Sequence, residues 1–365
     1  MTAKSIQSER STEGMVDYDR NSSAQQQLVR VHEPLLRELV GRLGQVEPEF
    51  RIVDYGCGPG TSAIDAVKPT VAAYRALFPD SPIAVCHADQ PGNDWNALFK
   101  LATGSGGYRD GDLVRTEAAV GSFFNQMAPS RSVAIGTSFV ASHWFSRAVE
   151  VDAPGTIWFA DLTGDARAEI AAFARSDWVR FLHCRAAELK PGGYMLVATL
   201  GSVPDEGEVN GIAASGRGIY RAIQVVAQQM ADDGLIRADV LDRFLFGLWF
   251  MTAEEAGEPL QSEPDLQDVF DVETIRVEAA PHNAADLFAN AVNDPAQYAD
   301  LYTGYTRAFG ASTLRTQLFA RCAETEAQVD ELEHEFFRRL HALYLRDTAK
   351  YACEIWYLLV VLRRK

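Results

Sequence analysis

The chain has 365 residues, of which 47% are hydrophobic and 23% are charged, and its formal net charge is −16. These values suit a globular protein with either one large α/β domain and an insertion, or two domains that share a cleft. The negative charge argues against nucleic acid or an anionic membrane as partner, because both bind basic surfaces. A small anionic substrate would therefore depend on local hydrogen-bond donors.

The cysteines and the ends of the chain favour a cytoplasmic protein. The five cysteines are scattered and form no Cys-x-x-Cys pair, which is typical of reduced thiols and not of a disulfide or zinc framework. Residues 1–13 have no apolar run like that of a signal peptide and are expected to form a loose tail. The apolar segment at 355–365 is far shorter than the ~20 residues of a spanning helix. It predicts a buried strand, and we expect no integral membrane segment.

The first half of the chain has the pattern of an α/β fold. Apolar residues from Leu28 to Leu43 recur at spacings of three and four and predict a helix, which Pro34 should end or kink. A second helix is predicted over 166–189. Short apolar runs predict buried strands at 50–55, 82–89, 132–139, 156–161 and 194–200. This alternation indicates a doubly wound, mostly parallel sheet.

The second half changes character after Gly201. We divide the chain into the tail, an α/β core at 14–204, a helical cap in two parts, and core strands that return to the sheet. The cap parts are 205–265 and 283–350, and the returning strands are a pair within 266–282 and a final strand within 351–365. The two helical excursions should cover the carboxyl edge of the sheet as a lid.

A glycine-rich loop follows the first predicted strand, in the stretch VDYGCGPGTSA. Gly56, Gly58 and Gly60 would let the backbone turn tightly and approach a ligand. The loop lacks the dinucleotide fingerprint because Thr61 stands where its third glycine is needed. Asp54, just before the glycines, is typical of folds that bind S-adenosylmethionine, where a carboxylate can pair with the cationic aminoacyl end.

Two further segments fit a nucleoside cofactor. Asp89 follows the second strand, where an acidic side chain can accept both ribose hydroxyls, although the residues after it also form a turn. Ser122 and Phe123 precede the next strand and are candidates for contacts to adenine. Taken alone, Phe123 is better explained as a core residue.

These segments, with an opening stretch, resemble the SABATH methyltransferases, the salicylic acid, benzoic acid and theobromine group. The motifs run in order from about residue 14 to 201: YDRNSSAQQQ, VDYGCGPG, DQPGNDWN, GSFFNQMAPSRSV, SHWFS and FLHCRAAELKPGGYM. The resemblance implies a Rossmann-like α/β methyltransferase fold with an α-helical cap and S-adenosyl-L-methionine as cofactor. It also implies a carboxylic acid or ring nitrogen as acceptor, and often a homodimer.

The resemblance also implies roles for single residues. The expected cofactor contacts are Tyr18, Ser22, Asp54, Gly56, Gly58, Asp89, Gln90, Ser122 and Phe123. Two departures stand out. Asp17 and Asp19 flank Tyr18 and add carboxylates at the mouth of the site, and Gln90 replaces an apolar residue that usually packs against adenine.

Gln25 and Trp144 match the family's glutamine and tryptophan that hold a substrate carboxylate. Amide and indole N–H groups are neutral donors, so they can orient a carboxylate without the bidentate pairing that an arginine would impose on its oxygens. The alternative for Gln25 is structural, because Ser22-x-x-Gln25 also fits a capping box before a helix.

The remaining predictions concern the substrate. His143 is expected to be a pocket wall, since a carboxylic acid with a pKa near ~4 is ionised at neutral pH and needs no base. Val140 stands where the family often has tyrosine, which favours a medium- or long-chain fatty acid over an aromatic or indole acid. Phenol or ring-nitrogen methylation and a non-catalytic cofactor-binding regulator are the other candidates. Glu331 and His334 share a helix face, but a solvated helix explains them and we expect no metal.

Overall fold

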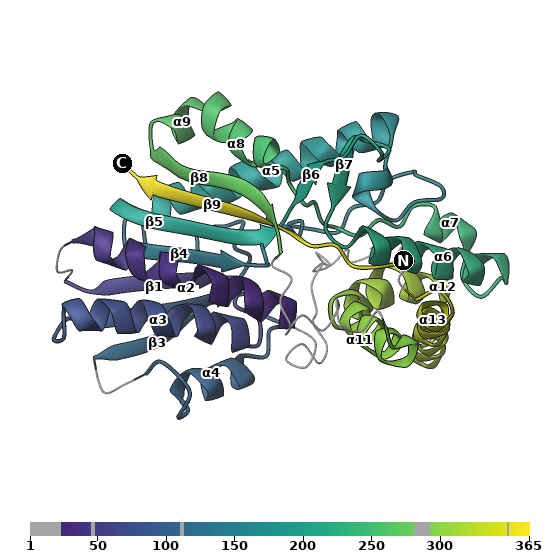
Figure 1. Ribbon diagram of the computed structural model, residues 1–365, viewed down its shortest axis with the longest axis horizontal. Coiled ribbons are helices and arrows are strands. Elements are labelled where there is room, and N and C mark those ends of the chain that lie inside the picture. Colours follow the sequence, from purple (N-terminus) through teal and green to yellow (C-terminus); the bar gives the residue numbers. More distant parts are fainter. Residues whose placement is uncertain (1–22, 45–47, 110–112, 281–292, 349) are drawn as a thin grey trace, which may run out of the picture.

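The computed structural model describes residues 23–44, 48–109, 113–280, 293–348 and 350–365. Its centre is a seven-stranded sheet in the order β3-β2-β1-β4-β5-β9-β8 (Figure 1). The strands are β1 (Phe50–Tyr55), β2 (Ile83–Asp89), β3 (Val114–Val120), β4 (Val133–Phe139), β5 (Leu189–Leu200), β8 (Phe270–Ala279) and β9 (Trp356–Arg364). The first five are parallel, and β9 runs antiparallel to both β5 and β8. The predicted doubly wound α/β fold is confirmed.

Helices cover both faces of the sheet. α2 (Ser23–Leu43) and α3 (Thr61–Leu77) pack together on one face, where their apolar residues join those of β1, β2 and β4. α5 (Gly164–Glu188) lies on the other face, with α8 (Ala253–Ser262) and α9 (Pro264–Gln267) beside it. The short α4 (Trp95–Thr103) follows β2. This layered arrangement leaves the carboxyl ends of β1, β2 and β4 at one edge.

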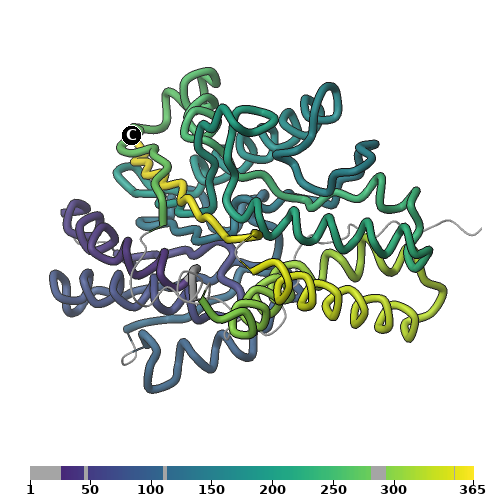
Figure 2. Tube along the Cα trace, turned by 45° about the vertical axis from the view of Figure 1, so that its right-hand side comes forward, coloured from purple at the N-terminus to yellow at the C-terminus, as the bar shows by residue number. Residues whose placement is uncertain are grey.

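A second group of helices packs beyond that edge. It contains α6 (Arg217–Asp232), α7 (Ala238–Leu241), α11 (Pro295–Thr313), the π-helix η2 (Leu314–Phe319), α12 (Ala320–Cys322) and α13 (Glu326–Arg346). α11 packs on α13 and α13 on α6, and Figure 2 shows the group extending away from the sheet. The small hairpin of β6 (Ser202–Pro204) and β7 (Ile212–Ala214) leads into it. α8, although within 205–265, packs against α5 and β8 instead, and so does α9, which crosses residue 265.

The structure differs from the expectations at four elements. Pro34 does not end a helix, because α2 is continuous and its buried leucines hold it on the sheet on both sides of the proline, while the expected kink stays a prediction. The run at 156–161 is no strand but ends in the 3₁₀ turn η1 (Phe159–Asp161). Its aromatic rings pack on the second helical group, with Trp158 stacked at 4.0 Å on Tyr220.

The other two differences concern the sheet. β3 was not predicted, because its sequence VRTEAAV carries charges and many of its residues are exposed, whereas a buried strand has a continuous apolar run. The expected pair of strands near 268–280 is the single strand β8, whose partner is the C-terminal β9. Within the described ranges, no helix has both the length and the apolar character needed to cross a membrane.

Candidate functional site

The glycine-rich loop lies at the carboxyl edge of the sheet, between β1 and α3. Gly56 has a φ of +80°, which non-glycine residues rarely adopt. A Cβ on Gly56 would lie 2.2 Å from the Cβ of Ala141, in the loop after β4. A side chain at this position would therefore push the loops after β1 and β4 apart.

Asp89 binds this loop through backbone groups. Its Oδ2 accepts a hydrogen bond from the Gly58 amide at 2.6 Å, and its Oδ1 accepts one from the Gln90 amide at 2.7 Å. Asn93 donates to the carbonyl of Gly58 at 2.8 Å and closes the turn. Burial raises the pKa of Asp89. The Cys57 thiol also hydrogen-bonds to this carboxylate, and an ionised carboxylate has about four acceptor sites, so the side chain can still accept a hydroxyl donor.

Asp54, at the end of β1, is a buried acid. It is 3% exposed, and its Oδ1 accepts a hydrogen bond from the Thr137 hydroxyl at 2.6 Å. Burial raises its pKa to about 7, and the nearby charge of Asp89 adds to this rise. In the part of the chain that the structure describes, no lysine or arginine forms an ion pair with it. A bound cation would stabilise its ionised form.

Ser122 and Phe123 lie in the loop between β3 and β4. The Ser122 hydroxyl accepts a hydrogen bond from the Phe124 amide at 3.3 Å and remains partly exposed. Phe123 is 4% exposed, and its ring lies edge-on to Phe181 of α5 at 6.0 Å between centroids. Phe123 is therefore a core residue that also borders Gly56, while Ser122 stays accessible at the same edge.

The loop after β4 carries Val140, His143 and Trp144. Val140 has a φ of +52°, a strained conformation for a β-branched residue, at a cost of about 1–3 kcal/mol. His143 Nδ1 is 2.7 Å from the Thr199 hydroxyl, and burial lowers its pKa to about 3, so the ring is neutral. Trp144 is 4% exposed, and its indole N–H has no hydrogen-bond partner among the described residues.

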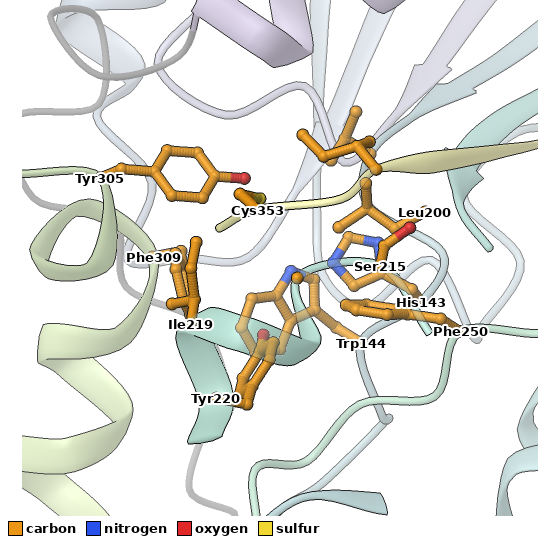
Figure 3. Close-up of a pocket in the computed structure, with 13 residues that line it drawn as sticks. His143, Trp144, Leu200, Ser215, Ile219, Tyr220, Phe250, Tyr305, Phe309 and Cys353 are labelled. Atoms are coloured by element: carbon orange, nitrogen blue, oxygen red, sulfur yellow. The ribbon is translucent and has the colours of Figure 1, made fainter. Parts of the chain in front are cut away.

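These three side chains form one wall of a largely apolar cavity between the sheet edge and the second helical group. Figure 3 shows Trp144 beside His143, with Tyr305 and Phe309 of α11 on the opposite side. The other lining residues come from the end of β5, the start of α6, the loop before α8 and the segment before β9. They are Leu200, Ser215, Gly216, Ile219, Tyr220, Phe250, Cys353 and Ile355. No charged side chain lines this cavity within the described chain.

The sequence reasoning missed the far wall of the cavity. Tyr305 and Phe309 are spaced by four residues on α11, a signal that predicts a buried helix face but not what that face covers. Phe250 lies in an irregular segment without periodicity. Only the positions of these elements in the fold could assign the residues to the site.

Other predicted residues fall at or beyond the limits of the described chain. Tyr18 and Ser22 lie outside the described residues, and so do Asp17 and Asp19. Gln25 belongs to the first turn of α2, but its side chain lies outside the description. The choice between its carboxylate role and its capping role therefore stays a prediction. No cluster of three or more potential metal ligands occurs among the described residues.

Known proteins are similar in sequence to this chain over most of its length. A family model described as SAM dependent carboxyl methyltransferase matches residues 7–365. Salicylate carboxymethyltransferase of Clarkia breweri is 26% identical over 244 residues, which cover 63% of this chain and 66% of that protein. Jasmonate O-methyltransferase of Arabidopsis thaliana is 23% identical over 288 residues, covering 68% of this chain and 72% of its own.

Among solved structures, loganic acid methyltransferase with SAH has the same fold. The TM-score is 0.73 at 21% sequence identity, and the similarity covers 97% of this chain and 98% of the other. The family model spans almost the whole chain, including both helical segments, which lie beyond the motifs at about 14–201. The chain therefore belongs to the SAM dependent carboxyl methyltransferases, the SABATH family, whose cofactor is S-adenosylmethionine.

Proposed function

We propose that this protein methylates a free carboxylic acid, most favourably a medium- or long-chain fatty acid, to its methyl ester. The indole N–H of Trp144, which lies at the wall of an apolar cavity and has no hydrogen-bond partner among the described residues, is the observation that carries the proposal. A buried donor without a partner costs about 1–3 kcal/mol, and a carboxylate oxygen in the cavity would remove that cost. Gln25 would supply the second donor.

The residues at the carboxyl edge of the sheet suit S-adenosylmethionine. The buried carboxylate of Asp54 would bind the cationic aminoacyl end, and the remaining acceptor site of Asp89 would accept a ribose hydroxyl. Ser122 and Phe123 would contact adenine, with Gly56 and Gly58 allowing close approach. When bound, S-adenosylmethionine supplies an electrophilic methyl group on a sulfonium. The chain's own task is to align the acid and exclude water.

No general base is needed for this reaction. A carboxylic acid is ionised at neutral pH, with an ordinary pKa near ~4. His143, with a pKa of about 3 and its Nδ1 beside Thr199, would be a weak base for a phenol or a ring nitrogen. The neutral imidazole supports a carboxylate as acceptor.

The non-enzymatic alternative is a regulator that binds the cofactor. Such a protein would bind S-adenosylmethionine without transferring its methyl group.

The shape and lining of the cavity bear on the acid. Leu200, Ile219 and Ile355 offer an aliphatic lining, and the position of Val140 leaves room that a tyrosine would fill. The relatives are named for salicylate and jasmonate. The rings of Tyr220, Phe250, Tyr305 and Phe309 support an aromatic or indole acid as second candidate.

The test is methyl transfer to a panel of acids, with ester detected by mass. Straight-chain acids of increasing length are compared with benzoic, salicylic and indole-3-acetic acids. If the acyl chain of the substrate binds in the cavity, each added methylene should lower the activation free energy for kcat/KM by up to about 0.8 kcal/mol, until the cavity is full. Ester from aromatic acids alone would overturn the fatty-acid proposal, and cofactor binding without ester from any acid would overturn carboxyl transfer.

Trp144→Phe tests the carboxylate donor. It keeps an aromatic ring but removes the N–H, so we expect kcat/KM for the acid to fall about tenfold to a hundredfold with cofactor affinity unchanged. Trp158→Phe is the matched control, since its indole N–H is also buried and unpartnered among the described residues but does not line the cavity. Equal losses in both variants would contradict the assignment.

We also propose that α6, α7 and α11 to α13 act as a cap over the cavity, and that the protein is a cytoplasmic homodimer. Tyr305 and Phe309 support the cap, because α11 supplies them to the cavity wall. Light scattering of the purified protein tests the dimer through its molar mass in solution, and cell fractionation tests the cytoplasmic location.

A further inference from the structure

A fully buried ion pair lies on α5 beneath the loop that carries Ser122 and Phe123. Arg185 and Glu188 are both 0% exposed. Arg185 Nε donates to Glu188 Oε2 at 2.8 Å, and Nη2 donates to Oε1 at 2.9 Å. The guanidinium also lies 3.8 Å above the ring of Tyr55, whose hydroxyl donates to Glu188 Oε2.

The pair holds four backbone groups of the loop at 121–128. Arg185 donates to the carbonyl of Phe123 at 2.8 Å and to that of Asn125 at 3.1 Å. Glu188 Oε1 accepts from the amides of Met127 and Ala128, the latter at 3.2 Å. One ion pair thus satisfies both donors and acceptors of a segment that belongs to no helix or strand.

Stability alone does not account for such a pair. Taking two charges out of water is costly, and apolar replacements of buried ion pairs are often neutral or stabilising. An apolar pair could not satisfy the four backbone groups of this loop, and each buried group left unpaired would destabilise it. The pair therefore specifies the conformation of the loop.

The position of the network connects it to the cofactor site. Tyr55 directly follows Asp54 and precedes Gly56, so the same Glu188 carboxylate contacts the end of β1 and the loop of Ser122. We propose that Arg185, Glu188 and Tyr55 are positioning residues. They hold the loop at 121–128 in a fixed position relative to the end of β1, so that both segments contact one cofactor. This inference rests on the cofactor roles given above to Ser122 and Phe123.

The test is cofactor affinity in Arg185→Lys and Glu188→Gln. Lysine keeps the charge but cannot reach two carbonyls and the carboxylate in one plane, and glutamine keeps the shape but loses one acceptor oxygen. We expect Kd for S-adenosylhomocysteine and KM for S-adenosylmethionine to rise about tenfold. At saturating cofactor, kcat and KM for the acid should stay within about threefold of the wild type.

Controls separate this role from folding. Arg175→Lys alters an exposed ion pair between α5 and Glu258 of α8, and it should leave cofactor affinity unchanged. Tyr55→Phe removes one hydroxyl and keeps the ring, so it tests the network if the charged variants fail to fold. We expect it to raise Kd about threefold.

A second ligand locates the defect at the adenine end. Methylthioadenosine contains adenine and ribose but no aminoacyl group, so its affinity should fall by the same factor as that of S-adenosylhomocysteine in Arg185→Lys. Unchanged Kd values in Arg185→Lys, Glu188→Gln and Tyr55→Phe, with only a lower Tm, would overturn the proposal. Because the readout is binding, the outcome is independent of which acid is methylated, or of whether any is.

Discussion

Asp54→Asn should make the cofactor-free protein more stable while it removes cofactor binding. The Asp54 carboxyl is buried, and its pKa rises from the ordinary 3.8 to about 7. At ~1.4 kcal/mol per pKa unit, the ionised form costs the folded protein up to ~4 kcal/mol. An asparagine avoids this charge and can still accept the hydrogen bond of Thr137. Its NH₂ group gains no partner, so we expect a net gain of ~2 kcal/mol.

The sign of the pH dependence follows from the same shift. The unfolded chain releases the Asp54 proton near pH 4, whereas the folded protein keeps it until about pH 7. Between these values the folded state binds more protons, so this group lowers the stability of the wild type as the pH rises. Above about pH 7 the full cost is present. The advantage of Asp54→Asn should therefore be largest at pH 8 and should reverse near pH 4, where the carboxyl is largely protonated in the folded protein and only the cost of the unpaired NH₂ group remains.

The assay is thermal unfolding of the cofactor-free proteins at pH 8 and near pH 4.5. An unfolding entropy of ~2.1 cal/mol/K per residue gives ~0.8 kcal/mol/K for 365 residues, so ~2 kcal/mol corresponds to a Tm about 3 °C higher. Asp80→Asn, at an exposed position, is the control. A lower Tm at pH 8, or an equal gain at both pH values, would refute the burial argument. Calorimetry with S-adenosylhomocysteine should show loss of binding only in Asp54→Asn.

Two other substitutions test the loops near Asp54. Gly56→Ala should lower Tm and cofactor affinity together, since a Cβ would lie 2.2 Å from Ala141 at a φ of +80°, whereas Gly92→Ala, with nothing within 4 Å, should change neither. Binding by Gly56→Ala at the wild-type Kd would contradict the close approach of the two loops. His143→Asn should retain most of kcat, and kcat at saturating cofactor should be flat from about pH 6 to about pH 8 in both proteins, because His143 has a pKa of about 3. An inflection near pH 6.5 that disappears in His143→Asn would identify His143 as a base.

The parallel core could be predicted from local sequence. Most residues of β1, β2, β4 and β5 are buried, so each strand contains a largely apolar run that stands out without alignment or structure. The carboxyl ends of parallel strands meet at one edge, which is why Asp54 and Asp89 could be expected to lie near each other. The half-exposed β3 has no such run and was missed. The run at 156–161 was misassigned because burial in an aromatic cluster leaves the same apolar pattern as burial in a sheet.

The sequence by itself determined the chemistry of the cofactor edge: which acids follow which strands, where glycines permit a turn, and which motifs resemble the family. Only the tertiary structure decided how these groups behave. Burial, which depends on all the packed layers, sets the pKa values of Asp54 and His143. The cavity wall joins Trp144 to Tyr305, and these residues are far apart in the chain. Such contacts depend on how the helices pack against the sheet edge, and local periodicity records only that a helix face is buried, not what it meets.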